Sequence, residues 1–255
     1  MQALTKTVYR MLFKLKRGTE PLNYGRETVT AWAADHCRSL ERARILDLGL
    51  GSGQDLLNIR AALPDNGLEL HGVESHPPHV ASARESGIQV AQIDLERERL
   101  LHGDATIDVV IANQVIEHTK EIFWIFAEVA RVLRPGGIAI IGVPNLASLH
   151  NRVALLVGQQ PPAIETLGPH VRGFTAPAFR RFVTATGHFT LEARAGANFY
   201  PLPPSLAKPL ARLLPGLAVG SIYRLRRTGA EGSFLDVLDR AFFETNYYRG
   251  PAPSD

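Results

Sequence analysis

The chain has 255 residues, 45% hydrophobic and 21% charged, a composition typical of a globular protein with one large α/β domain. Its net charge of +3 is too small to indicate nucleic-acid binding. The single cysteine, Cys37, excludes an internal disulfide framework and a cysteine-based zinc site, and it fits a reducing cytosol. No apolar run approaches the ~18 residues of a membrane span, and no secretory signal begins the chain, so we expect a cytoplasmic location.

The chain begins with a basic and apolar segment. Residues 3–17 contain no acid, and their apolar positions recur at helical spacing. We expect residues 1–24 to form an N-terminal cap on the domain, with a helix at 3–17. The alternative is a helix lying on an anionic membrane surface, because its basic residues accompany an apolar face. A loop at 18–25 and a helix at 27–40 should follow.

Three glycines at alternate positions mark the most informative stretch. A strand expected at 44–48 leads through Gly49, Gly51 and Gly53 into a helix at 55–62. Glycines allow a backbone to turn tightly and to approach a ligand, because they carry no Cβ. The turn would bring that ligand to the helix N-terminus, where N–H groups lack partners. A dinucleotide-binding turn requires G-x-G-x-x-G instead, so this spacing favours a cofactor with an amino-acid end.

Acidic residues accompany this turn and end two of the predicted strands. Asp47 precedes the first glycine and could stand near an ammonium group. Glu74 lies about 20 residues past Gly53, the separation expected of a carboxylate that accepts hydrogen bonds from ribose hydroxyls. Asp94 could meet an adenine amino group, and Leu95 could flank the adenine ring.

The central part of the chain alternates strands and helices. Further strands are expected at 68–73, 88–93, 108–113 and 138–143, with helices at 79–86 and 121–133. We interpret residues 134–137 as a turn. Such alternation is typical of a right-handed parallel α/β sheet. The fourth strand ends where a doubly wound sheet reverses direction, so Asn113, Gln114, Glu117 and His118 should face the ligand crevice.

The glycine motif and three later segments resemble class I S-adenosylmethionine-dependent methyltransferases. The resemblance covers about residues 25–200, and its later segments are 108–118, 131–137 and 142–145. Within this class, the chain is similar to the small-molecule group that includes ubiquinone-biosynthesis O-methyltransferases and methyltransferases of glycan and lipid pathways. One departure is Leu50, where many relatives carry a small residue or cysteine. This departure should not disturb binding if the Leu50 side chain points away from the ligand.

The resemblance implies an α/β fold: a doubly wound, seven-stranded Rossmann-like sheet with helices on both faces and an antiparallel last strand. It implies a methyltransferase domain at 25–228 with a tail at 229–255, and S-adenosyl-L-methionine as cofactor. The residues expected to bind the cofactor are Asp47, Gly49, Gly51, Gly53, Glu74, Ser75, Asp94, Leu95, Asn113 and Gln114.

Two insertions are expected on the substrate side or the surface, at 146–186 and 201–218. The first contains helices at 146–157 and 176–186, separated by a loop and by the segment His170 to Thr175, which resembles a His-x-Arg-x-Phe-Thr segment of the same group. Loops in this position commonly select the substrate. Strands six and seven are expected at 188–195 and 220–227.

Two clusters near the C-terminal half have alternative interpretations. Four leucines within 205–217 could form an apolar face that packs on the domain, or one that meets a membrane or a lipid substrate. They are Leu206, Leu210, Leu213 and Leu214. Arg224, Arg226 and Arg227 are interpreted as a solvated strand face. The aromatic residues of the tail could pack on the domain or on a second subunit.

Two histidines are candidates for the catalytic base. His118 and His170 could each accept a proton near neutral pH, which a hydroxyl acceptor must lose. Glu117 and His118 could also bind a divalent ion, but two ligands do not make a site, so no metal is expected.

The predicted function is transfer of a methyl group to a small-molecule, glycan or lipid-linked acceptor, with oxygen as the favoured atom. A nicotinamide-dependent oxidoreductase is disfavoured by the glycine spacing. The third hypothesis is an inactive methyltransferase fold that serves as a scaffold. The residues after the fourth strand do not form an Asn-Pro-Pro-aromatic tetrad, which argues against nucleic-acid methylation. Peripheral membrane contact through 3–17 or 205–217 remains an option. The acceptor and the oligomeric state are left open.

Overall fold

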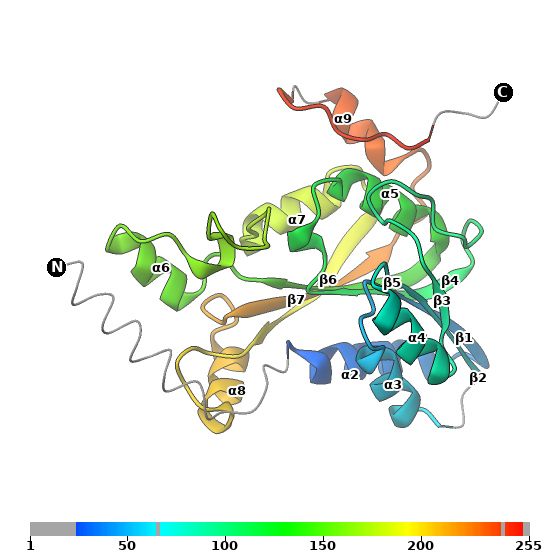
Figure 1. Ribbon diagram of the computed structural model, residues 1–255, viewed down its shortest axis with the longest axis horizontal. Coiled ribbons are helices and arrows are strands. Elements are labelled where there is room, and N and C mark those ends of the chain that lie inside the picture. Colours follow the sequence, from blue (N-terminus) through cyan, green and yellow to red (C-terminus); the bar gives the residue numbers. More distant parts are fainter. Residues whose placement is uncertain (1–23, 65–66, 241–242, 252–255) are drawn as a thin grey trace.

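The computed structural model describes residues 24–64, 67–240 and 243–251, so the helix expected at 3–17 lies outside the described residues. A seven-stranded sheet forms its centre, in the order β3-β2-β1-β4-β5-β7-β6 (Figure 1). The strands are β1 (Arg42–Leu48), β2 (Gly67–Val73), β3 (Gln89–Ala91), β4 (Ile107–Asn113), β5 (Leu133–Pro144), β6 (Phe189–Ala197) and β7 (Gly220–Arg227).

The pairing of the strands confirms the predicted fold. Neighbouring strands from β3 to β5 pair in parallel, whereas β7 is inserted antiparallel between β5 and β6. The chain proceeds outward from β1 to β3 and then returns to β4 on the other side of β1. The carboxyl ends of β1 and β4 therefore lie side by side at the switch point, where α/β sheets bind their ligands.

Helices cover both faces of the sheet (Figure 1). The helices are α2 (Arg26–Cys37), α3 (Gln54–Ala62), α4 (Pro77–Glu85), α5 (Ile122–Val132), α6 (Leu149–Leu156), α7 (Ala176–Thr184), α8 (Pro204–Leu213) and α9 (Val237–Arg240). Helices α2 and α3 pack on one face, and α5 and α7 pack on the other. Alternate residues of β4 serve the two cores, Val110 and Ala112 on the α5 side and Val109 and Ile111 on the α2 side.

Two predicted boundaries were wrong. The third strand was expected at 88–93 but spans only Gln89–Ala91. Residues 134–137 were expected to form a turn, yet they belong to β5, which starts at Leu133 opposite Ile107. The register shifts between Ile107 and Val109, and Gly136 has a positive φ of 84°. A glycine in this conformation lets a strand bulge and then continue. The residues expected to form a turn therefore introduce an irregularity within β5.

Of the four leucines of the predicted apolar face, three are exposed to solvent and only Leu210 is partly buried and packs on the domain. The packing interpretation was therefore wrong for three of the four. Leu206 and Leu213 are 57% and 76% exposed, whereas Ala207 and Ala211 are buried. A Cβ on Gly196 of β6 would lie only 2.6 Å from the Ala211 carbonyl oxygen. The helix and the strand approach so closely that small residues form their contact.

The interpretation of the β7 arginines as a solvated face was also wrong. Arg224 forms ion pairs with Asp35 and Glu192, and Arg226 pairs with Glu192 as well. Arg227 donates to the carbonyl of Ala130 at 2.8 Å. These arginines tie β7 to its neighbours.

The tail packs back on the domain. Phe234 is buried in the core on the α5 side, and Tyr247 and Tyr248 contact Phe123 and Trp124 of α5, with ring centroids 4.8 and 5.3 Å apart. Across the described ranges, no helix has the length and apolar character needed to cross a membrane.

Candidate active site

The glycine loop joins β1 to α3 with the conformation that the sequence predicts. Gly49, Gly51 and Gly53 have positive φ angles of 64°, 54° and 81°. A Cβ would lie 2.8 Å from Val115 if built on Gly49 and 2.5 Å from Ile88 if built on Gly53, but on Gly51 it would meet no atom within 4 Å. The outer two glycines therefore permit close packing, while the middle one borders open space.

The Leu50 side chain points away from that space, which meets the condition under which it would not disturb binding. It is only 6% exposed and belongs to the core on the α2 side. Its methyl groups lie under Gly72 of β2, where an added Cβ would be 2.7 Å away. The departure from the family pattern at this position therefore fills the core.

Glu74 reaches the glycine loop from the end of β2. One of its carboxylate oxygens accepts from the Gly51 N–H at 2.9 Å, and the other accepts from the His76 N–H at 2.8 Å. These bonds hold the carboxylate at the mouth of the loop. Each oxygen retains a lone pair, so the group can still accept from a ligand hydroxyl.

Asp47 is buried without a hydrogen-bond donor in the described part of the chain. The residue is 3% exposed. Burial is the main cause that raises its pKa well above the usual range, and Asp55 and Glu74 add to the effect while Arg26 opposes it. A cation placed beside this carboxylate would restore its charged form.

Sequence reasoning missed Arg26 and Asp55. Asp55 lies in the first turn of α3, where its carboxylate pairs with the Arg26 Nε at 3.3 Å and accepts from the Asn113 Nδ2 at 3.1 Å. The position of Asp55 two residues after Gly53 was a usable signal. Arg26 comes from α2, and only tertiary packing brings it here.

The other predicted cofactor residues surround this region less closely. Gln114 has a positive φ of 61°, and its N–H donates to the Gly142 carbonyl at 2.8 Å. Ser75 follows Glu74, and its carbonyl accepts from Gln92. Asp94 caps the turn after β3 by accepting from the Glu96 N–H, and the partly buried Leu95 packs against the core. Their contacts with a cofactor remain predictions.

The arrangement fits S-adenosylmethionine. The buried Asp47 suits its ammonium group, Glu74 can accept from ribose hydroxyls, and the open side of Gly51 allows close approach. A net negative cluster of three carboxyl groups and one guanidinium would disfavour the pyrophosphate of a dinucleotide.

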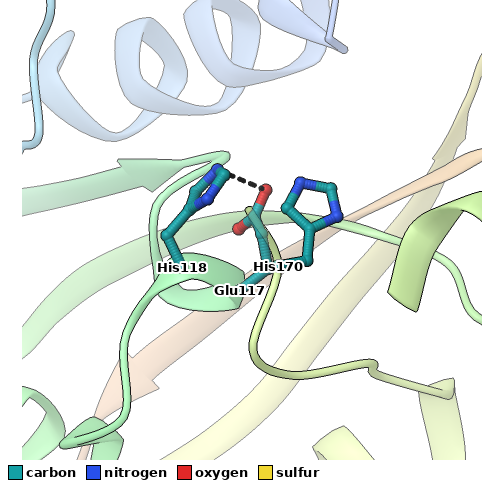
Figure 2. A group of neighbouring side chains, drawn as sticks. All are labelled: Glu117, His118 and His170. Atoms are coloured by element: carbon teal, nitrogen blue, oxygen red, sulfur yellow. Dashed lines mark ion pairs between the residues drawn. The ribbon is translucent and has the colours of Figure 1, made fainter. Parts of the chain in front are cut away.

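A second cluster lies just beyond β4 (Figure 2). Glu117 and His118 belong to the 3₁₀ turn η2 (Ile116–His118), and His170 comes from the loop before α7. One ligand atom from each residue lies within 4.8 Å of the other two. The imidazole rings of the two histidines are 4.7 Å apart, and the His118 Nε2 is 4.0 Å from a Glu117 oxygen. The structure thus brings together three side chains of which the sequence linked only two.

The segment from His170 to Thr175 anchors this cluster to the neighbouring elements. The N–H groups of Val171 and Arg172 donate to the Glu117 carbonyl at 2.9 and 3.2 Å, and the Arg172 guanidinium donates to the carbonyl of Lys120. Phe174 is buried in the core. Thr175 is the N-cap of α7 and accepts from the Ala178 N–H.

The environment of Glu117 is unusual for a carboxylate. It is 1% exposed, and neither oxygen has a hydrogen-bond partner in the described structure. Burial raises the pKa of Glu117 to about 7. Burial also lowers the pKa of His118; the Pro169 carbonyl works against this shift, and His170 adds to it.

Comparisons with known proteins agree with the methyltransferase resemblance of the glycine loop and the sheet. Residues 46–139 match a family model described as a methyltransferase domain. The ubiquinone biosynthesis O-methyltransferase of Rhizobium leguminosarum bv. trifolii is 28% identical over 127 residues, which are 48% of this chain and 46% of that protein. The chain thus spans less than half the length of the curated relatives that it matches.

Solved structures share the fold. An S-adenosylmethionine-dependent methyltransferase from Mesorhizobium loti aligns with a TM-score of 0.52 at 18% identity, covering 80% of this chain and 100% of that one. The 1,6-didemethyltoxoflavin-N1-methyltransferase of Burkholderia thailandensis, with S-adenosylhomocysteine bound, aligns with a TM-score of 0.50 at 18% identity, covering 78% of each chain. The sheet topology, the glycine loop and the match of residues 46–139 to a methyltransferase domain agree with a class I S-adenosylmethionine-dependent methyltransferase fold.

Proposed function

We propose that this protein is an S-adenosylmethionine-dependent methyltransferase acting on an oxygen atom of a small-molecule, glycan or lipid-linked acceptor. The observation that carries the proposal is the buried Asp47 carboxylate, which lacks a hydrogen-bond donor among the described residues and adjoins the glycine loop. S-adenosylmethionine supplies an electrophilic methyl group on a sulfonium, and its ammonium group matches the charge that Asp47 needs.

In this proposal, the residues in and around the glycine loop have separate roles in cofactor binding. Asp47 binds the ammonium group, and Glu74 accepts hydrogen bonds from the ribose hydroxyls. Asn113 donates to Asp55 and thereby orients a carboxylate beside Asp47. The outer glycines permit the turn, and the middle one leaves room for the ligand. Ser75, Asp94, Leu95 and Gln114 are proposed for the adenosine end.

The acceptor is placed beside the Glu117–His118–His170 cluster. Val115 packs against Gly49, so the residues that follow it leave the cofactor loop directly toward the cluster. A hydroxyl acceptor must lose a proton as the new bond to carbon forms. His118 and His170 are the proposed proton acceptors, and their presence at this edge favours an oxygen acceptor.

Exposed apolar residues provide a surface for a lipid-linked acceptor. On α6, Val153 and Leu156 are 52% and 85% exposed, and on α8 Leu206 and Leu213 are exposed as well. We propose these helices as the place where an acyl or isoprenoid chain, or a membrane surface, would contact the protein. The proposed contact through residues 3–17 rests on the sequence alone.

Calorimetric titration with S-adenosylmethionine tests the cofactor assignment, and a parallel titration with NAD tests the alternative hypothesis of an oxidoreductase. We expect micromolar binding of S-adenosylmethionine alone. Asp47→Ala and Glu74→Ala should each weaken it by about 1–3 kcal/mol, the cost of losing a charged hydrogen-bond partner. Failure of the folded protein to bind S-adenosylmethionine would favour the scaffold hypothesis, and binding of NAD would favour an oxidoreductase.

The acceptor is then sought by methyl transfer from labelled S-adenosylmethionine to fractionated cell extracts. Alkali- and acid-stability of the labelled product distinguishes an ester, an ether and an amine. A methylated nitrogen or carbon would refute oxygen as the acceptor atom while leaving the cofactor assignment intact.

A further inference from the structure

Hydrogen-bond acceptors converge in the Glu117–His118–His170 cluster without a donor among the described residues to satisfy them. Both carboxylate oxygens of Glu117 are buried, and among the described residues neither has a hydrogen-bond partner from another residue. A buried carboxylate is costly unless it is paired with a cation, bonded to donors or bound to a metal. While it is ionised, this carboxylate therefore calls for a positively charged group that the described part of the chain does not itself supply.

The two histidines present lone pairs to the same space. The His118 Nδ1 lies 3.3 Å from the Pro169 carbonyl oxygen, and the His170 Nδ1 lies 3.0 Å from the Ala163 carbonyl oxygen. A carbonyl oxygen can only accept a hydrogen bond, so in both rings Nδ1 carries the proton and Nε2 carries the lone pair. Histidines that bind metals commonly donate their other N–H to a backbone carbonyl, which fixes the tautomer in this way.

The orientation of the side chains agrees with a shared ligand. Figure 2 shows the Glu117 carboxylate between the His118 and His170 rings, with His118 directed toward it. The ligand atoms lie within 4.8 Å of one another, whereas bonds of ~2.1 Å to one zinc ion would place them about 3.4 Å apart. Small side-chain rotations would close this difference, and His118 is exposed enough to make them.

We propose that Glu117, His118 and His170 bind one divalent ion of the first transition row, with zinc as the representative. Two imidazoles and one carboxylate suit such ions better than calcium or magnesium, which prefer oxygen ligands. Three protein ligands leave a coordination position open, as in catalytic rather than structural sites.

The catalytic role of the ion rests on the proposed function. An acceptor hydroxyl in the open position would have its pKa lowered by the metal. Its oxygen then attacks the methyl carbon: the oxygen–carbon bond forms, the carbon–sulfur bond breaks, and the hydroxyl proton passes to solvent. His118 and His170 would then act as ligands and not as free bases.

Metal binding is tested directly on the untagged, chelator-treated protein. We expect titration calorimetry with ZnSO₄ to show one site per chain, with weaker binding of MgCl₂. Cobalt(II) should give the visible absorption of a low-symmetry site, and Zn²⁺ should raise the Tm. His170→Gln and Glu117→Gln should each weaken Zn²⁺ binding by more than about tenfold. If Glu117→Gln does not fold, His170→Gln alone decides.

The matched control is His102→Gln. His102 forms an edge-to-face pair with His71 of β2, with ring centroids 4.9 Å apart, so this variant removes a histidine of a similar pair. It should bind Zn²⁺ as the wild type does. The proposal fails if the wild-type protein does not bind Zn²⁺, if His170→Gln binds it equally well, or if His102→Gln loses it. S-adenosylmethionine titration of the same samples shows separately whether the proposed function holds.

Discussion

Two clusters in this protein contain one glutamate and two histidines with nearly the same spacing. His71 and His102 lie 4.9 Å apart and the His71 Nε2 is 4.0 Å from Glu69, while His118 and His170 lie 4.7 Å apart and the His118 Nε2 is 4.0 Å from Glu117. The glutamates differ. The Glu69 side chain is 32% exposed and accepts a hydrogen bond from the Arg44 Nε at 2.7 Å, which lowers the pKa of Glu69. Glu117, in contrast, is buried and has no hydrogen-bond partner among the described residues.

The difference shows that residue composition alone does not define a binding site. A carboxylate that already has a guanidinium partner and access to water needs no further cation. A buried carboxylate without one remains unstable until a cation arrives or a proton binds. Asp47 resembles Glu117 in this respect, although its proposed partner is the ammonium group of a cofactor.

The largest expected effect concerns Asp47. Its pKa is raised in the free protein, and a bound cation would lower it, so binding of S-adenosylmethionine should release a proton. The affinity should therefore increase with pH, by at most about tenfold per pH unit, until Asp47 is ionised in the free protein. Calorimetry in two buffers with different ionisation enthalpies measures the proton release. An Asp47→Asn variant that still releases the proton would contradict this assignment.

The cluster of Glu69, His71 and His102 should make the stability of the protein sensitive to acid. Burial, followed by the charges of His71, Arg131 and Arg44, lowers the pKa of His102 to about 4 from an ordinary 6.5. As the pH falls from 6.5 to about 4, the unfolded chain takes up a proton that the folded protein excludes, so stability is lost. We expect His102 to account for about 1–2 kcal/mol of that loss. Urea unfolding of wild type and His102→Gln across this range measures it, and parallel curves would refute it.

Glu117→Gln should stabilise the metal-free protein at pH 8 by about 1 kcal/mol, because the substitution removes a buried charge without a partner. It should also abolish the stabilisation by Zn²⁺. Thermal unfolding with and without Zn²⁺ tests both effects. Destabilisation of the metal-free protein would indicate that the Glu117 carboxylate has a structural role instead.

The smallest effect is expected at the partly exposed Glu69. Its ion pair with Arg44 is accessible to water, so Glu69→Gln should leave the Tm, the Zn²⁺ affinity and the S-adenosylmethionine affinity unchanged within error. A loss of Zn²⁺ binding in this variant would remove the distinction between the two clusters.

Much of the fold was predictable because its signals are local. The glycines at 49, 51 and 53 require a particular backbone, and the apolar run at 108–113 predicts a strand buried on both faces. Residues 134–137 were misinterpreted as a turn, although they belong to β5. A Pro-Gly-Gly sequence signals an irregular backbone, but it does not show whether a strand ends there or only bulges.

The site was predictable only in part. Asp47 and Glu74 follow from their spacing to the glycines, and Glu74 does contact Gly51. Arg26 was missed because it belongs to a helix before the first strand. The sequence left open whether the leucines at 206–214 pack on the domain or meet a lipid, and the close approach of Gly196 to Ala211 places alanines at that contact.

The sequence by itself determined the glycine loop, the alternation of strands and helices, and the acids at the strand ends, because each depends on residues close together in the chain. Tertiary structure alone decided that His170 meets Glu117 and His118, and that Arg44 neutralises Glu69 while Glu117 has no such partner. Burial and charge pairing depend on elements distant in sequence, and they decide which acids still need a cation.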